Sequence, residues 1–397
     1  MNLIIGGGVG GLSAAYYSSS ASLIFDKERE FGGRIKSLES FDSCDLGAQY
    51  FSSADSNVLD LLKKLKIEKE IQPFNLISFL ILNKNSNIKN SKSILEISKS
   101  KLHEFSTFSS YFYSLDENIR KDFDELSTKT LNAWYCEHFG GELIWFLDCL
   151  TNAIAFSNSQ QISAIYGLMV IASFFEKTYT FQPGLSFIVE RISKSLAKKN
   201  CICKLATPVS RINFRNNYAK SIETAAGSFP VSNKLISAIP ATSLSYLAKD
   251  LPVFSNLLKK VNYSSCGVVT YRIKKNILET SPGILFAGEP VSTIINRASQ
   301  NHSKERILTC LVPCRKYLDF RKITEKTILK IDPDFNNFII SSNVHFWKDS
   351  LPICSPDLLR LQKEILACLP LNLRIASDFI GYPSIDASIG NAKISTV

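Results

Sequence analysis

Apolar and polar residues along the chain alternate between strand-like and helix-like patterns. An apolar run at residues 2–5 leads into a glycine-rich turn, a helix of small residues at 11–20 and a second apolar run at 23–26. Apolar residues at helical spacing predict further helices at 58–65, 187–197, 356–369 and 384–394, and a mostly helical region over 116–176. Short apolar runs between turn residues predict strands at 201–204, 209–214, 219–223, 235–238, 268–273, 307–312 and 375–377. The pattern is that of an α/β protein with an inserted helical region.

Composition and charge narrow the class of protein. Of 397 residues, 45% are hydrophobic and 21% charged, which excludes a disordered, collagen-like or small disulfide-stapled chain. Lys and Arg (46) exceed Asp and Glu (36), giving a net charge of +10. The basic residues concentrate at 83–101 and 315–330, and neither segment interleaves aromatics at base-stacking spacing. We expect a solvated loop, a solvated helix face and no nucleic-acid partner, with steering of an anionic substrate as the alternative.

Cysteine spacing and hydropathy indicate whether the chain binds a metal, spans a membrane or is exported from the cytosol. The ten cysteines include no C-x-x-C, and the chain has four histidines, so we predict no metal site and free thiols in a reducing cytosol. The longest apolar run, 163–175, is shorter than the roughly 20 residues of a spanning helix. It predicts a buried helix, with a membrane-dipping helix as the alternative. No basic segment precedes the first strand at Leu3, so we expect no signal peptide and a cytoplasmic location.

The segment Gly6-Gly7-Gly8-Val9-Gly10-Gly11 has the G-x-G-x-x-G spacing of a dinucleotide-binding turn. In such a turn Gly6 permits the sharp bend, Gly8 lets the backbone approach a pyrophosphate, and Gly11 allows close packing of helix on strand. The helix that follows directs free N–H groups at the phosphates. Asp26 ends the next strand, where a carboxylate accepts hydrogen bonds from ribose hydroxyls. These residues together predict a Rossmann-type nucleotide site.

Two motifs follow the acidic residue: Phe31-Gly32-Gly33-Arg34, and Asp45-Leu46-Gly47-Ala48-Gln49-Tyr50-Phe51. In this order they resemble the flavin-containing amine oxidase superfamily, which includes protoporphyrinogen oxidases, and the second run is most similar to renalase. Weaker similarity continues at 182–185, 207–212, 238–240, 347–352 and 377–387. Residues 75–180 and 260–345 resemble the family only loosely.

The resemblance implies an FAD cofactor and a role for each matching residue. Arg34 would be a cation near the pyrophosphate, Asp378 would accept from a ribityl hydroxyl, and the backbone at Val209 would hold the adenine. The last helix would point its N-terminus at the flavin. The implied cofactor-binding residues are Gly6, Gly8, Val9, Gly10, Gly11, Asp26, Lys27, Gly33, Arg34, Gly47, Ala48, Gln49, Tyr50, Val209, Asp378, Ser384 and Ile385. The catalytic residues are not assigned, and Tyr50, Trp347 and Tyr382 are the candidates for lining the site.

Several positions depart from the family pattern. Val268 aligns with the lysine that amine oxidases carry near flavin N5, and Ser384 aligns with a tyrosine of their aromatic cage. Ser377 replaces a glycine before the acidic residue, and Asn391-Ala392 replaces a Ser-Gly pair in the last helix. The first two departures argue against oxidation of simple amines, and the last two suggest looser packing around FAD.

The sequence therefore predicts an α/β protein with a discontinuous Rossmann-type FAD-binding domain and an inserted α+β substrate domain. The FAD-binding parts are 1–75, 180–260 and 350–397, and the substrate parts are 76–179 and 261–349. The predicted function is a renalase-like oxidase that transfers hydride from a small reduced substrate to flavin and is reoxidised by oxygen. The alternatives are a protoporphyrinogen-oxidase or desaturase-type enzyme for a larger apolar substrate, and a non-catalytic flavoprotein or accessory protein.

Overall fold

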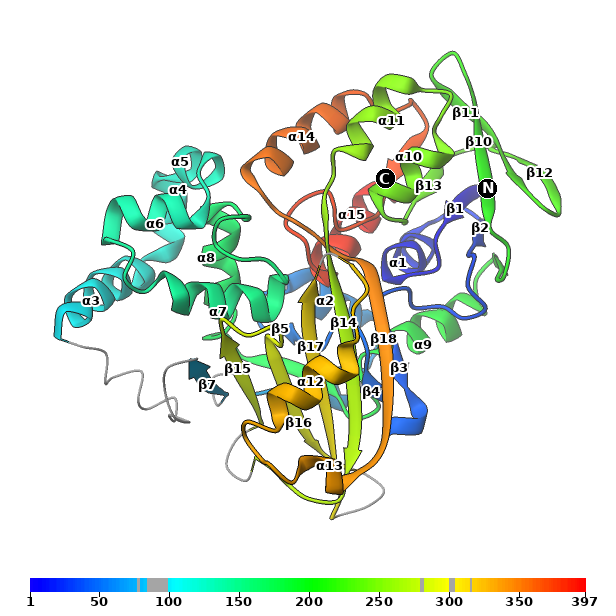
Figure 1. The fold of residues 1–397 in the computed structure, drawn as a ribbon. Helices are drawn as coiled ribbons and strands as arrows, with labels where there is room; N and C mark the ends of the chain where they lie inside the picture. Colours follow the sequence, from blue (N-terminus) through cyan, green and yellow to red (C-terminus); the bar gives the residue numbers. More distant parts are fainter. Residues whose placement is uncertain (77–78, 84–98, 279–281, 300–303, 315) are drawn as a thin grey trace.

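The computed structural model describes residues 1–76, 79–83, 99–278, 282–299, 304–314 and 316–397 (Figure 1). Its first sheet has five parallel strands drawn from four separate parts of the chain. In spatial order they are β19 (Leu373–Ile375), β13 (Leu235–Ser237), β1 (Asn2–Ile5), β2 (Ser22–Phe25) and β9 (Cys201–Lys204). Parallel strands need crossover connections, which is why the intervening segments cover this sheet on both faces.

Alternate residues of the central strands supply the two cores of this sheet. Ile4 and Ile24 face four helices, α1 (Val9–Tyr17), α2 (Ser56–Leu65), α9 (Ser186–Leu196) and α15 (Ile385–Thr396). Leu3 and Phe25 face the opposite way, toward an antiparallel sheet of β10 (Val209–Arg215), β11 (Tyr218–Thr224) and β12 (Gly227–Pro230). The central strands β1 and β2 therefore bury both faces, as their continuous apolar sequences predict, whereas the edge strand β9 is partly exposed.

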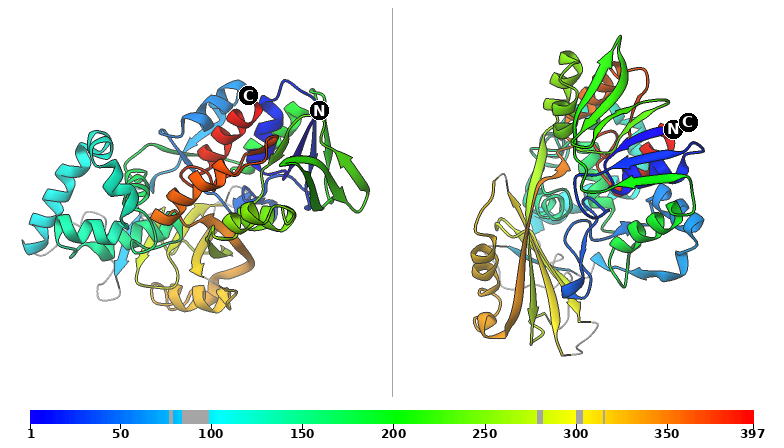
Figure 2. Two further views of the ribbon diagram at one scale, coloured as in Figure 1. Left: turned by 90° about the horizontal axis from the view of Figure 1, so that it is seen from above. Right: turned by 90° about the vertical axis from the view of Figure 1, so that its right-hand side faces the viewer.

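A second large sheet has six strands and is mostly antiparallel. In spatial order they are β18 (Ile339–Pro352), β14 (Tyr263–Ile273), β17 (Arg306–Cys314), β16 (Thr293–Ala298), β15 (Gly283–Ala287) and β7 (Leu80–Asn83). Helices α12 (Phe320–Ile328) and α13 (Phe335–Phe338) cover one face, where Phe320 and Phe335 pack on Tyr271. Figure 2 (right) shows these helices on one side of the sheet and blue N-terminal segments on the other.

Helices α3 to α8 form a group of their own beside the two sheets (Figure 1). They are α3 (Lys99–Tyr113), α4 (Leu115–Lys121), α5 (Phe123–Thr128), α6 (Leu131–Phe139), α7 (Ile144–Ala155) and α8 (Ala164–Ala172). Helix α8 lies within the longest apolar run, 163–175, and Ile165, Leu168 and Ile171 are buried in the helical core. Among the described residues, no helix has the length and hydropathy needed to cross a membrane.

Short elements complete the fold. The strand pair β3 (Ser37–Leu38) and β4 (Cys44–Asp45), and the three-stranded sheet β5 (Phe51–Ser52), β8 (Thr178–Phe181) and β6 (Ile71–Pro73), join the first sheet to the second. The remaining helices are α10 (Ala241–Leu247), α11 (Pro252–Lys259), α14 (Pro356–Ala367), η1 (Glu39–Phe41) and η2 (Glu68–Glu70). As its sequence predicts, α14 is capped by Ser355, whose Oγ accepts the Leu358 N–H at 3.2 Å.

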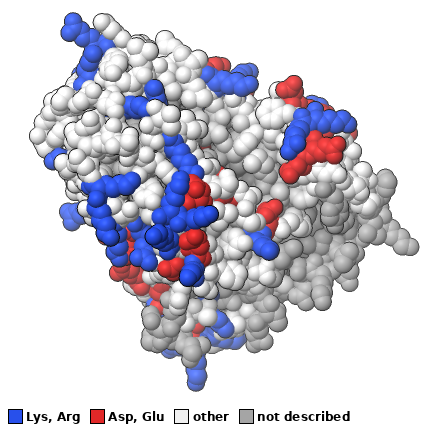
Figure 3. Space-filling view, turned by 180° about the vertical axis from the view of Figure 1, so that it is seen from behind, with Lys and Arg blue, Asp and Glu red and all other residues white. Residues whose placement is uncertain are grey.

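Surface charges are mixed in sign. On the face in Figure 3, many Lys and Arg side chains stand beside Asp or Glu. Helix α12, in the predicted basic segment 315–330, pairs Arg321 with Glu325 at 2.7 Å on its exposed side. Most of the other predicted basic segment, 83–101, lies outside the described residues. The ten cysteines are free thiols; five are buried, while Cys136 and Cys203 are exposed.

Candidate functional site

The glycine-rich turn between β1 and α1 has one open position among several crowded ones. A Cβ on Gly10 would lie 2.0 Å from the carbonyl oxygen of Ala376, and a Cβ on Gly11 would lie 1.9 Å from that of Gly6. Gly6 itself has φ +105°, which matches its predicted role in the bend. At Gly8, by contrast, the nearest atom to an added Cβ is the Gly32 carbonyl oxygen at 3.8 Å. The backbone at Gly8 is therefore the part of the turn that a ligand can approach.

The N-terminus of α1 meets this open position without a side-chain cap. Gly8 is the N-cap residue, and the first turn contains no acidic side chain. The uncapped N–H groups and the positive end of the helix dipole favour an anion here. Asp26 at the end of β2 accepts the Gly7 N–H at 2.5 Å and the Glu28 N–H at 2.7 Å. Its carboxylate is thus held beside the turn, while the Lys27 side chain is 75% exposed to solvent.

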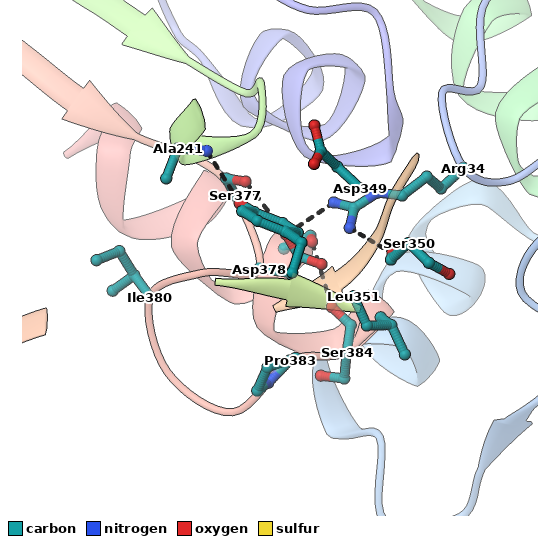
Figure 4. A network of polar contacts seen from close by, with 12 residues as sticks. Arg34, Ala241, Asp349, Ser350, Leu351, Ser377, Asp378, Ile380, Pro383 and Ser384 are labelled. Carbon is teal, nitrogen blue, oxygen red and sulfur yellow. Dashed lines mark hydrogen bonds and ion pairs between the residues drawn. The ribbon is translucent and has the colours of Figure 1, made fainter. Parts of the chain in front are cut away.

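Two predicted cofactor contacts, Arg34 and Asp378, bind each other. The Arg34 Nη2 lies 2.7 Å from Asp378 Oδ1, and its Nη1 donates to the Ser350 carbonyl oxygen at 2.8 Å (Figure 4). Burial acts to lower the pKa of Arg34, but Asp378, together with Tyr263 and Asp349, outweighs it, so the pKa is raised. The guanidinium stays charged, and Asp378, which is 3% exposed, has a cationic partner.

The segment Asp45–Tyr50, which we call the GAQ turn, folds against the Arg34 backbone. The Ala48 N–H donates to the Arg34 carbonyl oxygen at 3.2 Å, and a Cβ on Gly47 would lie 1.8 Å from the same oxygen. The Gln49 side chain points into the turn and donates to the Asp45 and Gly47 carbonyl oxygens at 2.7 and 3.0 Å. Only the backbone of Gln49 therefore remains for a ligand. The Tyr50 ring stacks on Phe74 at 5.5 Å between centroids.

Two of the departures near the C-terminus, Asn391 and Ser384, make hydrogen bonds that order the local backbone. The Asn391 Nδ2 donates to the carbonyl oxygens of Ser377 and Ile380 at 2.9 and 2.8 Å and so ties down the loop that carries Asp378. Ser384 caps its own helix, since its Oγ accepts the Ala387 N–H at 2.9 Å. These hydrogen bonds hold the loop in place and do not loosen it.

The first turn of α15 also supports α2. The Asp386 carboxylate accepts the N–H groups of Asn57 and Val58 at 2.7 and 3.0 Å, and the Asn57 side-chain amide at 2.8 Å. A carboxylate at the N-terminus of a neighbouring helix satisfies free N–H groups and complements the helix dipole. Asp386 therefore has a structural role at the start of α2.

Replacing Asp386 by Ala is expected to lower the free energy of unfolding by about 1–2 kcal/mol, as for loss of a helix cap. Urea unfolding followed by circular dichroism measures the change. Asp357 offers a matched control, because it also lies in the first turn of a helix but is 85% exposed and contacts Arg360. Asp357→Ala should change the free energy by less than about 0.5 kcal/mol. Equal effects of the two substitutions would contradict the capping role of Asp386.

The face of the six-stranded sheet that meets the GAQ turn is apolar. Cys266, Val268 and Leu311 are buried against Leu46, and the Trp347 Nε1 donates to the Leu46 carbonyl oxygen at 2.6 Å. Val268, which was aligned with the family lysine from the sequence, is thus buried in an apolar cluster. Trp347 contacts the turn through that carbonyl oxygen and supports it.

A pair of tyrosines joins the helical group to the loop before α15. The rings of Tyr166 on α8 and Tyr382 are nearly parallel, with centroids 6.3 Å apart, and the Tyr166 hydroxyl donates to the Pro383 carbonyl oxygen at 3.2 Å. Burial raises the pKa values of both hydroxyls, and Cys354 acts in the same direction, so both are neutral at ordinary pH. The sequence predicted Tyr382 as a site-lining candidate but gave no indication of Tyr166.

Comparison with known proteins agrees with this geometry. Residues 4–65 match the NAD(P)-binding Rossmann-like domain, and no curated protein sequence matches the chain. Three solved structures superpose over the whole chain and over 97% of their own length. They are a putative protoporphyrinogen oxidase from Exiguobacterium sp. 255-15 (TM-score 0.75, 16% identity), putrescine oxidase bound to putrescine (0.75, 13%) and cyclohexylamine oxidase from Brevibacterium oxydans IH-35A (0.77, 12%). The chain has the amine-oxidase fold. The resemblance predicted from the sequence is thus confirmed at the level of the fold.

Within the amine-oxidase fold, most predicted cofactor residues lie around the glycine-rich turn or the GAQ turn. A Cβ on Gly33 would lie 3.3 Å from the Gly8 Cα, and the Thr207 N–H donates to the Asp26 carbonyl oxygen at 2.7 Å, which brings the Val209 strand alongside. The sequence quoted Asp45 without a role and missed Tyr263 and Arg297. Asp45, two residues before Gly47-Ala48, was visible in the sequence, but no motif marks Tyr263 or Arg297.

Proposed function

We propose that this protein is an FAD-dependent oxidoreductase of the amine oxidase superfamily. The observation that carries the proposal is the open backbone at Gly8, which lies at the uncapped N-terminus of α1 and next to Asp26. A dinucleotide needs space and unpaired N–H groups for its pyrophosphate. It also needs a carboxylate at the end of the neighbouring strand for its ribose. The amine-oxidase fold supports flavin as the group that the dinucleotide carries.

The residues present fit FAD. The α1 N-terminus would hold the pyrophosphate, and Asp26 would accept hydrogen bonds from the adenosine ribose with the lone pairs that Gly7 and Glu28 leave free. The backbone from Gly47 to Tyr50 would lie against the flavin ring. Bound flavin supplies hydride acceptance from a substrate carbon and passage of the electrons to oxygen.

The substrate side of the proposed site is apolar and offers no lysine. Val268 and Leu311 would exclude water, and the stacked Tyr166 and Tyr382 would wall the site. The apolar residues of α8 are buried in the helical core, which leaves few of them to line a wide apolar tunnel. This favours a small reduced substrate, as in the renalase-like hypothesis, over a large apolar one.

Our proposed division into an FAD-binding domain and a substrate domain follows the boundaries predicted from the sequence.

The expected result is that the purified protein binds FAD and becomes yellow. Under anaerobic conditions, addition of a small reductant of the correct class should bleach the flavin absorbance, and admission of oxygen should restore it. Dihydronicotinamide isomers test the renalase-like reaction, and primary amines test the amine-oxidase reaction. Reduced tetrapyrroles test the larger-substrate alternative.

The following outcomes distinguish the candidate functions. Bleaching by a dihydronicotinamide isomer and not by a tetrapyrrole supports the proposal, whereas the reverse favours the protoporphyrinogen-oxidase-type alternative. A protein that binds FAD and is reduced by none of these compounds, but only by dithionite, points to the non-catalytic flavoprotein. A protein that takes up no added FAD contradicts the proposed function.

A further inference from the structure

A buried carboxylate stands at the start of the GAQ turn and joins three chain segments. Asp45 is fully buried, and its Oδ1 accepts the Ser37 hydroxyl at 2.6 Å and the Leu185 N–H at 2.8 Å. Gly184, with φ +78°, makes room for it, because a Cβ there would lie 2.7 Å from the same oxygen. Its Oδ2 is left to face the six-stranded sheet. A buried carboxylate needs a cationic partner, because desolvation penalises its charge.

Arg297 on β16 is that partner. Its Nη1 lies 3.5 Å from Asp45 Oδ2, and its Nη2 lies 3.4 Å from the Oε1 of Gln49. The guanidinium also lies over the Phe74 ring, 5.6 Å from the centroid, and Phe74 stacks on Tyr50. The planar guanidinium of Arg297 thus contacts two residues of the GAQ turn, Asp45 and Gln49. It also contacts Phe74, whose ring packs on Tyr50 at the end of the turn.

The opposite ends of the Gln49 amide explain why this contact matters. Its Nε2 binds the carbonyl oxygens of Asp45 and Gly47 and closes the turn, while its Oε1 faces Arg297. Without Arg297, the Gln49 Oε1 lacks a hydrogen-bond donor, and the amide is held less firmly in this orientation. The backbone of Gly47 and Ala48 then loses the hydrogen bonds from Gln49 that close the turn. Burial raises the pKa of Asp45 on balance, and Arg297 is the strongest influence that opposes this rise.

We propose that Arg297 is a positioning residue, which fixes the GAQ turn in the shape that receives the flavin ring and couples that turn to the substrate side of the protein. The inference rests on the proposed function, since it assigns the flavin to this turn. Arg297 does not touch the reacting atoms. It acts through Asp45, Gln49 and Phe74.

Another arginine of the same sheet provides a matched control. Arg272 on β14 is also mostly buried, and it pairs with Asp42 at 3.4 Å and with Glu305 at 3.3 Å. It lies near the Phe41 ring and donates to the Ser40 carbonyl oxygen. Its contacts resemble those of Arg297 in kind, but they fall on η1, Asp42 and Glu305 rather than on the GAQ turn.

The experiment compares the full chain with Arg297→Gln, Arg297→Lys and Arg272→Gln. FAD affinity is measured by fluorescence titration, the flavin environment by visible circular dichroism, and the GAQ turn by hydrogen exchange of a peptide spanning it in FAD-free protein. Arg297→Gln should weaken FAD binding at least about tenfold, change the flavin circular dichroism band and speed exchange in the turn. Arg297→Lys, which keeps the charge but not the fork, should restore part of the affinity.

The control separates positioning from general stability. Arg272→Gln should lower the melting temperature comparably and leave FAD affinity, the flavin band and exchange in the turn unchanged. The proposal is overturned if Arg297→Gln binds FAD with unchanged affinity and spectrum, or if Arg272→Gln disturbs the flavin equally. If the unmodified protein binds no FAD, the proposed function fails and this inference fails with it, and that result differs from loss of binding in the Arg297 variants alone.

Discussion

Gly8→Val is expected to leave the protein folded and to lower its affinity for FAD by at least about 100-fold. The backbone at Gly8 has φ −73° and ψ 179°, which any L residue adopts without strain. The nearest atom to an added Cβ is the Gly32 carbonyl oxygen at 3.8 Å, so a side chain there projects into the space that we assign to the pyrophosphate. Flavin fluorescence titration measures the affinity, and thermal unfolding of the FAD-free protein checks the fold.

Gly10→Ala is the contrasting variant. Its Cβ would lie 2.0 Å from the Ala376 carbonyl oxygen, and this atom belongs to backbone that cannot move independently. We expect a loss of about 3 kcal/mol or more in the free energy of unfolding, or failure to fold. Gly8→Ala, with the smaller side chain, should fall between the wild type and Gly8→Val in affinity. If Gly8→Val retains full FAD occupancy, the assignment of this turn to the cofactor is wrong.

Local chemistry explains why the first sheet was predictable. The strand at 201–204 has the predicted bounds. The helix predicted at 187–197 is observed at Ser186–Leu196, because its buried apolar residues recur at helical spacing. The last strand was placed at 375–377 but is Leu373–Ile375. Ala376 follows the strand at its carboxyl edge, where its N–H donates to the Ser237 carbonyl oxygen at 2.8 Å and its own carbonyl oxygen faces Gly10. This close approach fixes the end of the strand and leaves no signal in the local sequence.

Long-range pairing explains what the sequence did not reveal. Strand β18 (Ile339–Pro352) was not predicted, since most of its residues are only half-buried and its sequence lacks a clear alternation. The contact between Arg297 and Asp45 joins residues far apart in the chain and depends on the packing of β16 against the GAQ turn. Arg34 and Asp378 were predicted as separate cofactor contacts, and only the tertiary structure reveals that they form an ion pair.

That ion pair is expected to respond unequally to removal of its two partners. Arg34→Met leaves the Asp378 carboxylate, whose side chain is 4% exposed, without a cation, and should cost about 3–5 kcal/mol of unfolding free energy. Asp378→Asn should cost less, because Arg34 is 29% exposed and keeps its hydrogen bond to the Ser350 carbonyl oxygen. Urea unfolding of the FAD-free single and double variants gives the coupling energy.

The surface pair Arg211–Asp250 is the control for this cycle. It has the same 2.7 Å separation, but its side chains are 58% and 29% exposed, so its coupling should be below about 1 kcal/mol. A large coupling for Arg34 and Asp378 means that the charge of Arg34 is already neutralised by the protein. The N-terminus of α1 would then supply most of the attraction for the pyrophosphate, and Asp378→Asn should strengthen rather than weaken FAD binding through Arg34. Weaker binding in Asp378→Asn would instead indicate that the carboxylate itself contacts the cofactor, as the family resemblance implies.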